Sequence, residues 1–120
     1  MNIEQLQSYC LSKKATTEEF PFDEDTLVYK VLGKMFVIAP LKKWESGEAT
    51  ITLKGDPEYV VQLREQYSSV YPGPYVSNKH WNTIDIYKGE LKPQLILELI
   101  DHSYDMVVKG MTKKLKDKLL

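Results

Sequence analysis

The sequence has few of the residues that build disulfides, metal centres and base-specific contacts to DNA. Among its 120 residues, Cys10 is the only cysteine, Arg64 is the only arginine, and there are two histidines. A single cysteine excludes an intrachain disulfide and a cysteine-based metal site within one chain, and it suits a reducing cytosol. A single arginine leaves one side chain for bidentate contacts to guanine, so sequence-specific reading of the major groove is not expected.

No charge of one sign dominates, and no long apolar run is present. Sixteen Lys and Arg against 17 Asp and Glu leave a formal net charge of −1. This balance excludes a strongly basic nucleic-acid binder but leaves local patches open. No apolar stretch approaches the roughly 20 residues that span a bilayer, and the first residues do not have the pattern of a signal peptide. We therefore expect a soluble, cytoplasmic protein without membrane contacts.

The length and the helix signals predict one domain over residues 1–120. Asn2 is placed to cap a first helix, Asp56 and Pro57 form a typical helix start, and Pro93 opens the longest helix. Residues 113–120 are expected to form a short C-terminal helix or a frayed tail. No internal repeat or linker divides the chain.

Four segments have the composition of strands. Residues 27–32 and 35–39 flank Gly33-Lys34, the place for a tight hairpin, residues 49–54 alternate between apolar and polar, and residues 79–87 form a fourth strand. Thr16–Glu19 has the pattern of a capped turn. The expected order is α-β-β-β-α-β-α, and an antiparallel sheet with helices packed on one face is the natural α+β arrangement. The other face of the sheet is then expected to be open to water.

The fourth strand provides the most informative candidate surface. Alternation places Trp81 and Thr83 on the open face, beside Lys54 of the preceding strand, and places His80 and Asn82 on the core side. Aromatic rings stack on bases and lysines pair with phosphates, so this set resembles a binding platform. The alternative is that the aromatics only pack across the sheet. The candidate contact residues for nucleic acid or a protein partner are Lys30, Lys34, Lys54, Asn78, Lys79, His80, Trp81, Asn82 and Thr83.

Two further features invite a chemical interpretation. His80 is a candidate base or metal ligand, but no nucleophile lies in a recognisable frame, and a His80 held by a hydrogen bond to Asn82 or to nearby backbone is the expected arrangement. Five of the eight residues from 18 to 25 are acidic, which would suit a hard cation, although a solvated acidic loop is favoured. Phe20 and Phe22 are expected to anchor that loop onto the core. We expect no catalytic residues, no bound metal and no cofactor.

Several stretches together resemble the MmcQ/YjbR family of small bacterial proteins. The matching segments, which extend from about residue 3 to residue 112, are Cys10-Leu11-Ser12-Lys13, Thr17-Glu18-Glu19-Phe20-Pro21-Phe22, Tyr29-Lys30-Val31, Gly33-Lys34-Met35-Phe36, Leu53-Lys54, Asp56-Pro57-Glu58, Tyr71-Pro72, Asn78-Lys79-His80-Trp81-Asn82-Thr83 and Ser103-Tyr104. The run from Asn78 to Thr83 is the most specific of them. The resemblance implies a CyaY-like α+β fold with a double-wing arrangement of hairpins, and the customary description of the family as DNA-binding.

Three hypotheses follow for the function. The first is a non-enzymatic MmcQ/YjbR-type module that binds DNA weakly and without sequence specificity through the hairpin lysines and the Trp81 strand. The second is an adaptor that uses the open sheet face to bind a protein partner, or that handles metal as frataxin-like proteins do. The third is an enzyme or small-ligand binder around His80, Asn82 and the Tyr71 loop. The protein is expected to be a monomer.

Overall fold

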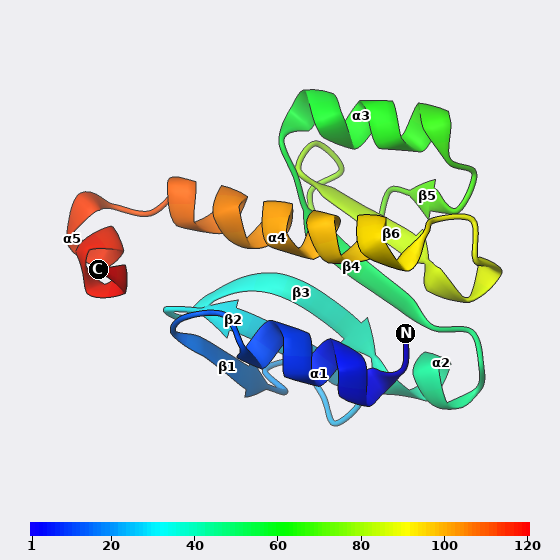
Figure 1. The fold of residues 1–120 in the computed structure, drawn as a ribbon, viewed down its shortest axis with the longest axis horizontal. Helices are drawn as coiled ribbons and strands as arrows, with labels where there is room; N and C mark the ends of the chain where they lie inside the picture. The colour runs from blue at the N-terminus through cyan, green and yellow to red at the C-terminus, as the bar shows by residue number, and fades with distance from the viewer.

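The computed structural model describes residues 1–120 and consists of one six-stranded antiparallel sheet with five α-helices (Figure 1). The helices are α1 (Ile3–Leu11), α2 (Leu41–Glu45), α3 (Pro57–Gln66), α4 (Pro93–Lys109) and α5 (Lys113–Lys116). The strands are β1 (Thr16–Glu19), β2 (Thr26–Val31), β3 (Lys34–Pro40), β4 (Thr50–Lys54), β5 (Val70–Tyr71) and β6 (Trp81–Asp85). Short 3-10 turns, η1 (Ile86–Lys88) and η2 (Asp117–Leu119), follow β6 and α5.

Local sequence signals account for where several elements begin. Asn2 and Gln5 form a capping box at the start of α1, each side chain accepting from the other's backbone N–H at 2.8 Å. Asp56 caps α3, and Pro57 occupies its first position, where no backbone N–H is required. The β2–β3 hairpin turns through Leu32 and Gly33, one residue before the predicted Gly33-Lys34. Both residues lie at positive φ (49° and 82°), as a two-residue turn of type I′ requires.

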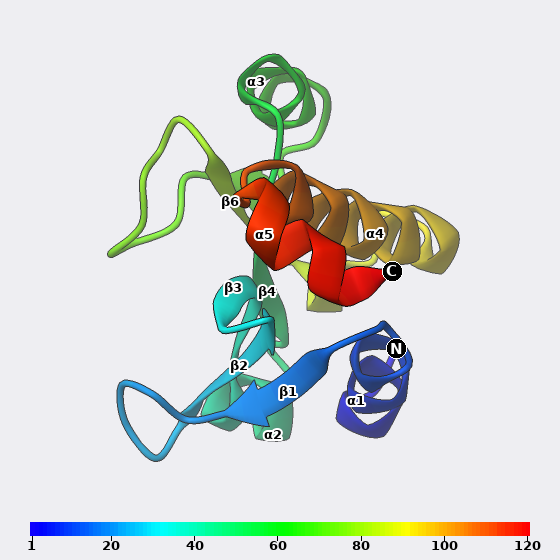
Figure 2. The ribbon, with the colours of Figure 1, turned by 90° about the vertical axis from the view of Figure 1, so that its left-hand side faces the viewer.

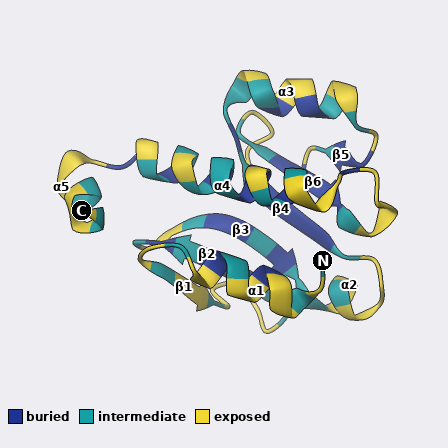
Figure 3. Cartoon of the chain, viewed as in Figure 1, coloured by how far each residue is buried: buried dark blue, intermediate teal, exposed yellow.

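The core lies between the sheet and the helices on one of its faces. The strand order is β1-β2-β3-β4-β6-β5, and all the pairings are antiparallel. Apolar residues on the helix side of the sheet pack with those of α1 and α4, and Figure 3 shows the central strands as the most buried part of the chain. The shared core includes Leu6, Cys10, Tyr29, Val37, Ile51, Leu53, Ile84, Ile100 and Val107.

The β3–β4 junction divides the sheet into two halves. Only Val37 with Leu53 and Ile38 with Thr52 are in register there, whereas β4 and β6 pair over five positions. Helix α4 lies over this junction and contacts both β3 and β4 (Figure 1). The longest helix therefore spans the place where the sheet is least continuous.

The predicted fold class is confirmed, and the element order needs three additions. Thr16–Glu19 is strand β1 and not a capped turn, because it pairs with β2 along its whole length. Val70–Tyr71 forms the short edge strand β5, and Leu41–Glu45 forms helix α2. Ile86 leaves the predicted fourth strand and begins η1. A two-residue strand and a one-turn helix carry no periodic signal, so tertiary contacts decide them.

None of the helices combines the length and the apolar character needed to cross a membrane.

Candidate functional site: a groove on the second face of the sheet

The sheet face that points away from the helices is a groove and not an open surface. Two loops, residues 20–25 and residues 72–80, project from the sheet on the side opposite α1 and α4 (Figure 2). The groove between them has a volume of about 720 Å³. Its lining includes Ile38 and Thr52 from the sheet, together with Phe22 and Tyr75 from the two loops.

The expectation that this face would be exposed to water is therefore wrong. Thr50 and Thr52 retain only 4% and 9% of their accessible surface, and Thr83 retains 5%. The alternation of residues was assigned correctly, because Thr52 and Thr83 do lie opposite each other on the non-helical face. What the pattern could not show is that the loop after β5 folds back over that face.

Gly73 brings this loop down onto the floor of the groove. The hydroxyls of Thr52 and Thr83 are hydrogen-bonded at 2.8 Å, and a Cβ placed on Gly73 would overlap the Thr83 hydroxyl. A residue without a side chain is therefore required at this point. The close approach sets the position of Pro74, Tyr75 and Val76, which form one wall.

The opposite wall is the acidic loop, and its aromatic residues do not behave as predicted. Phe20 and Phe22 are 47% and 62% exposed, so they do not anchor the loop in the core. Asp23 orders the loop instead, accepting from the backbone N–H groups of Asp25 and Thr26 at 2.9 and 2.6 Å. These bonds lower the pKa of Asp23, the bonds from Thr26 having the largest effect. Phe22 is thus free to line the groove, opposite the fully exposed Tyr75.

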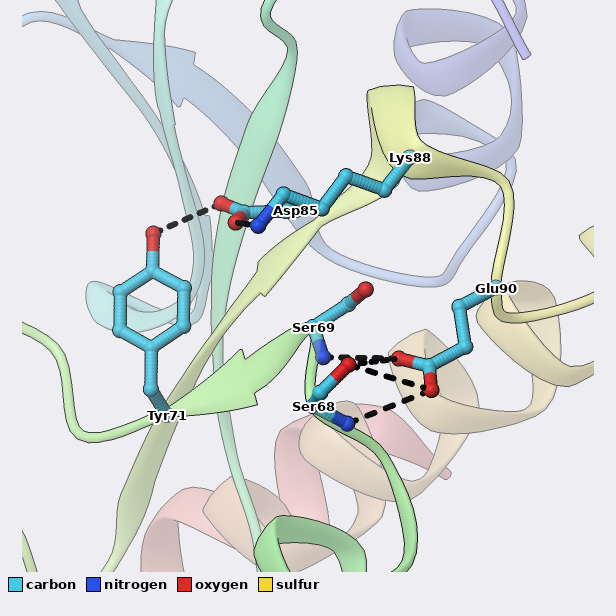
Figure 4. Close-up of polar contacts among 6 residues, drawn as sticks. All are labelled: Ser68, Ser69, Tyr71, Asp85, Lys88 and Glu90. Atoms are coloured by element: carbon cyan, nitrogen blue, oxygen red, sulfur yellow. Dashed lines mark hydrogen bonds and ion pairs between the residues drawn. The ribbon is translucent and has the colours of Figure 1, made fainter.

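A buried carboxylate closes the edge of the groove near β5 (Figure 4). Tyr71 donates to Asp85 at 2.8 Å, and Lys88 pairs with the other carboxylate oxygen at 3.1 Å. Burial, together with the bond to Asp85, raises the pKa of Tyr71 to about 12. The bond to Asp85 also raises the pKa of Lys88. The cluster is internally satisfied, so its role is to hold Tyr71 against the groove.

Glu90 holds the backbone directly before β5 (Figure 4). Its carboxylate accepts from the backbone N–H of Ser69 at 2.7 Å and from that of Ser68 at 3.3 Å. The hydrogen bonds from Ser69 and Ser68 lower the pKa of Glu90. The backbone N–H groups of Ser68 and Ser69, directly before β5, therefore both have a hydrogen-bond acceptor.

Part of the Asn78–Thr83 motif has a structural role. Asn82 is 3% exposed, donates to the Val60 carbonyl at 3.0 Å and accepts from Arg64 Nε at 2.6 Å. Arg64 also donates to the carbonyls of Asn78 and Trp81. The single arginine and Asn82 therefore join α3 to the segment that leads into β6, and neither side chain is available to a ligand.

Of the predicted contact residues, Thr83 lines the groove, and the others lie outside its lining. Lys54 and Trp81 are cross-strand neighbours on β4 and β6, beyond the Thr52–Thr83 pair. Lys34 and Lys79 are exposed, and neither forms an ion pair. Lys30 is different, because its ammonium pairs with Glu19 at 3.3 Å.

The histidines and the acidic residues do not assemble a reactive centre. The ring of His80 makes no hydrogen bond, so the expected bond to Asn82 or to nearby backbone is wrong. Only the main chain of His80 is bonded, to Ser77 and Gly55. His102 Nε2 accepts from the Asp56 backbone N–H at 3.1 Å. No group of three His, Cys, Asp or Glu side chains is arranged to hold a metal ion.

Sequence reasoning missed the residues that shape the groove. Phe22, Tyr75 and Val76 belong to irregular loops, and the sequence pattern marks Met35 and Ile38 only as strand residues. The available signal was the aromatic content of the two loops, Phe20-Pro21-Phe22 and Pro74-Tyr75, since exposed aromatics on loops are typical of binding sites.

A family model named YjbR matches residues 11–106 of the chain. The chain belongs to the YjbR family. The YjbR protein of Escherichia coli K12 is 32% identical over 120 residues, which cover the whole chain and 98% of that protein. YbdF of Escherichia coli O157:H7 is 33% identical over 96 residues, covering 79% of the chain and 75% of YbdF. Both relatives are described as uncharacterized, so they indicate the family of the chain but no activity.

Two crystal structures of bacterial proteins share the fold of this YjbR family member. The Deinococcus radiodurans protein DR2400, described as having a DUF419 domain, aligns with a TM-score of 0.86 at 34% identity, over 98% of this chain and 87% of that protein. A protein from Pseudomonas syringae aligns with a TM-score of 0.72 at 26% identity, over 88% and 98% of the two chains.

Proposed function

We propose that this YjbR family member is a non-enzymatic binding protein, and that its groove holds an apolar segment of a protein partner. The observation that carries the proposal is the pairing of two exposed aromatic residues, Phe22 and Tyr75, on the walls of one groove whose floor is Ile38, Thr52 and Thr83. Aromatic residues are the side chains that most often dominate the energetics of protein interfaces.

The dimensions of the groove support this function. A volume of about 720 Å³ lies within the range of roughly 300–1,000 Å³ that is usual for ligand sites. The walls and floor combine Met35, Ile38 and Val76 with a few polar hydroxyls. An apolar side chain that enters the groove loses contact with water on several sides at once, which is the main source of favourable binding energy for such a surface.

The chemistry of the lining favours binding over catalysis. No histidine or cysteine lines the groove. Cys10 is fully buried in the core, and burial raises the pKa of its thiol to about 12. Tyr71 is likewise held in its protonated form by burial and by Asp85. The groove therefore offers neither a cysteine nucleophile nor a histidine base, the groups that most often carry covalent catalysis.

Nucleic-acid binding is the second candidate, and the arrangement of Lys54 beside Trp81 favours it. Lys34, Lys54 and Lys79 form no ion pairs, so they are available to phosphates. Two observations place this candidate second. Arg64 and Asn82 are bonded to each other inside the protein, and Asp23 of the acidic loop lines the neighbouring groove, where it would repel a polyanion.

Selection from a random peptide library displayed on phage tests the proposed function. The wild-type protein should enrich peptides that bind in solution, and Tyr75→Ala should lose that binding. Tyr87→Ala is the matched control, because Tyr87 is a 46% exposed aromatic that does not line the groove. Failure to enrich any peptide, or equal binding by Tyr75→Ala, would exclude the groove as a protein-binding site.

Fluorescence anisotropy with labelled single- and double-stranded DNA tests the second candidate, at a low salt concentration of about 50 mM. Binding through the lysines predicts a steep loss of affinity with added salt and weaker binding by Lys54→Glu, whereas Lys109→Glu at the end of α4 serves as the control. Affinity no tighter than that of a control protein of similar charge would exclude this function.

A further inference from the structure

We infer that the partner segment carries a carboxylate beside its apolar side chain, and that Lys43 is the residue that pairs with it. The inference rests on the proposed function, because it concerns the ligand of the same groove. It comes from comparing the charged and polar groups that line the groove with the contacts that each already makes.

The acidic groups at the groove are already used within the protein. Asp23 accepts hydrogen bonds from two backbone N–H groups and from the Thr26 hydroxyl. Asp25 accepts from the backbone N–H of Lys42 at 2.8 Å. Both carboxylates therefore hold the loop and the start of α2 in place, and neither requires a cation from a ligand.

Lys43 is the free charge of the lining. It is exposed, it lines the groove, and its ammonium takes part in none of the ion pairs of the protein. The side chain of Lys43 is free, but its backbone is fixed because two hydrogen bonds hold helix α2. Asp25 accepts from the Lys42 N–H, and Trp44 Nε1 donates to the Thr50 carbonyl at 2.9 Å. The Lys43 ammonium is therefore attached to a fixed point of the backbone beside the groove.

The floor of the same groove adds hydrogen-bond donors. In the Thr52–Thr83 pair only one hydroxyl donates to the other, so the accepting hydroxyl retains a proton that it can donate to a ligand. The Thr50 hydroxyl, which also lines the groove, makes no hydrogen bond within the protein. Spare donors and one free ammonium complement an acceptor with negative charge, and a carboxylate meets both requirements.

The rest of the lining restricts the occupant to an apolar protein segment with an isolated acid. Met35, Ile38 and Val76 gain nothing from a chain of phosphates, and Asp23, which lines the groove, disfavours a dense polyanion. One carboxylate placed at Lys43 avoids that repulsion. The expected motif is therefore an aromatic or aliphatic residue adjacent to Asp or Glu.

The test compares the peptides that the wild-type protein and two variants select from the same displayed library. The wild-type protein should enrich apolar peptides with an excess of Asp and Glu, and Lys43→Glu should enrich apolar peptides with Lys and Arg instead. Lys42→Glu is the matched control, because Lys42 is exposed on the same helix but does not line the groove. It should select the same peptides as the wild type.

A second measurement uses the best enriched peptide and its Asp→Asn or Glu→Gln version in titrations. The neutral version should bind the wild type about three- to tenfold more weakly and should bind Lys43→Glu at least as well as the acidic version does. Enriched peptides without an acidic excess, or an unchanged preference in Lys43→Glu, would overturn the inference and leave the proposed function standing. Wild-type protein that enriches no peptide but binds DNA would overturn both.

Discussion

The hydroxyl of Ser103 in α4 donates to the carbonyl of Phe36 in β3 at 2.6 Å, and it accepts from the Lys54 N–H of β4 at 2.9 Å. If the register of Val37 with Leu53 continued by one residue, Phe36 and Lys54 would lie opposite each other. A helix side chain therefore supplies the bonds where the two strands separate. This contact ties the longest helix to the junction between the halves of the sheet.

Ser103→Ala should lower the free energy of unfolding by about 1–3 kcal/mol, because it leaves the buried Phe36 carbonyl and the partly buried Lys54 N–H without this partner. Urea denaturation followed by tryptophan fluorescence measures the change. Ser8→Ala, on the exposed side of α1, is the control and should change stability little. An equal effect of the two substitutions would show that the Ser103 bridge is not needed.

Arg64→Lys should also destabilise the protein, by about 1–3 kcal/mol, since a lysine cannot reproduce the bonds to Asn82, Asn78 and Trp81. Gln62→Ala, an exposed position on the same helix, is the control in the denaturation experiment. The structural role assigned to Arg64 would be contradicted by a variant of wild-type stability that binds DNA more weakly.

Gly73→Ala should displace the loop that forms one wall of the groove, because the added Cβ overlaps the Thr83 hydroxyl. We expect a loss of about 1–3 kcal/mol in stability and weaker peptide binding. Thr83→Ala in the same chain removes the overlapping atom, so a double-mutant cycle should show partial recovery. Gly110→Ala, where the nearest neighbour would lie at 3.6 Å, is the control. Additive effects of Gly73→Ala and Thr83→Ala would rule out the contact.

The Cys10 thiol should react with a thiol reagent only when the protein unfolds. It is fully buried, and burial raises its pKa to about 12, which keeps the reactive thiolate at a very low population. The labelling rate should therefore rise in Ser103→Ala by the same factor as the equilibrium constant for unfolding, which is about tenfold for each 1.4 kcal/mol of lost stability. Rapid labelling of the wild type under native conditions would contradict this burial.

Glu90 should contribute to the loss of stability in acid. The pKa of Glu90 is lower in the folded state than in the unfolded chain, where a glutamate has a pKa of about 4.3. Its contribution to stability is therefore fully present above that unfolded-state pKa and is lost as the pH falls through the folded-state pKa of Glu90. Glu90→Gln cannot titrate, and its stability should change less between about pH 6 and pH 3. Glu65→Gln, an exposed carboxylate without hydrogen-bond partners, should retain the wild-type acid dependence. Identical pH profiles for Glu90→Gln and the wild type would contradict the assignment.

The sequence by itself determined the fold class and many of the local starts. Asn2, Asp56, Pro57 and Pro93 act through the few residues that follow them, and hairpin turns such as the one at Gly33 depend on local backbone angles. The alternation on the strands also placed Trp81 and Thr83 on the correct face. These features can be predicted because the interactions that produce them join residues that are close together in the sequence.

Tertiary structure alone decided the site. The groove exists because the loop after β5 folds over β6 and the loop after β1 stands opposite it, and these loops are separated by more than a third of the chain. It also decided that Asn82 and Arg64 bond to each other inside the protein and that Lys43 faces the groove without a partner. Such relationships depend on contacts between distant segments, which periodicity and local propensity do not encode.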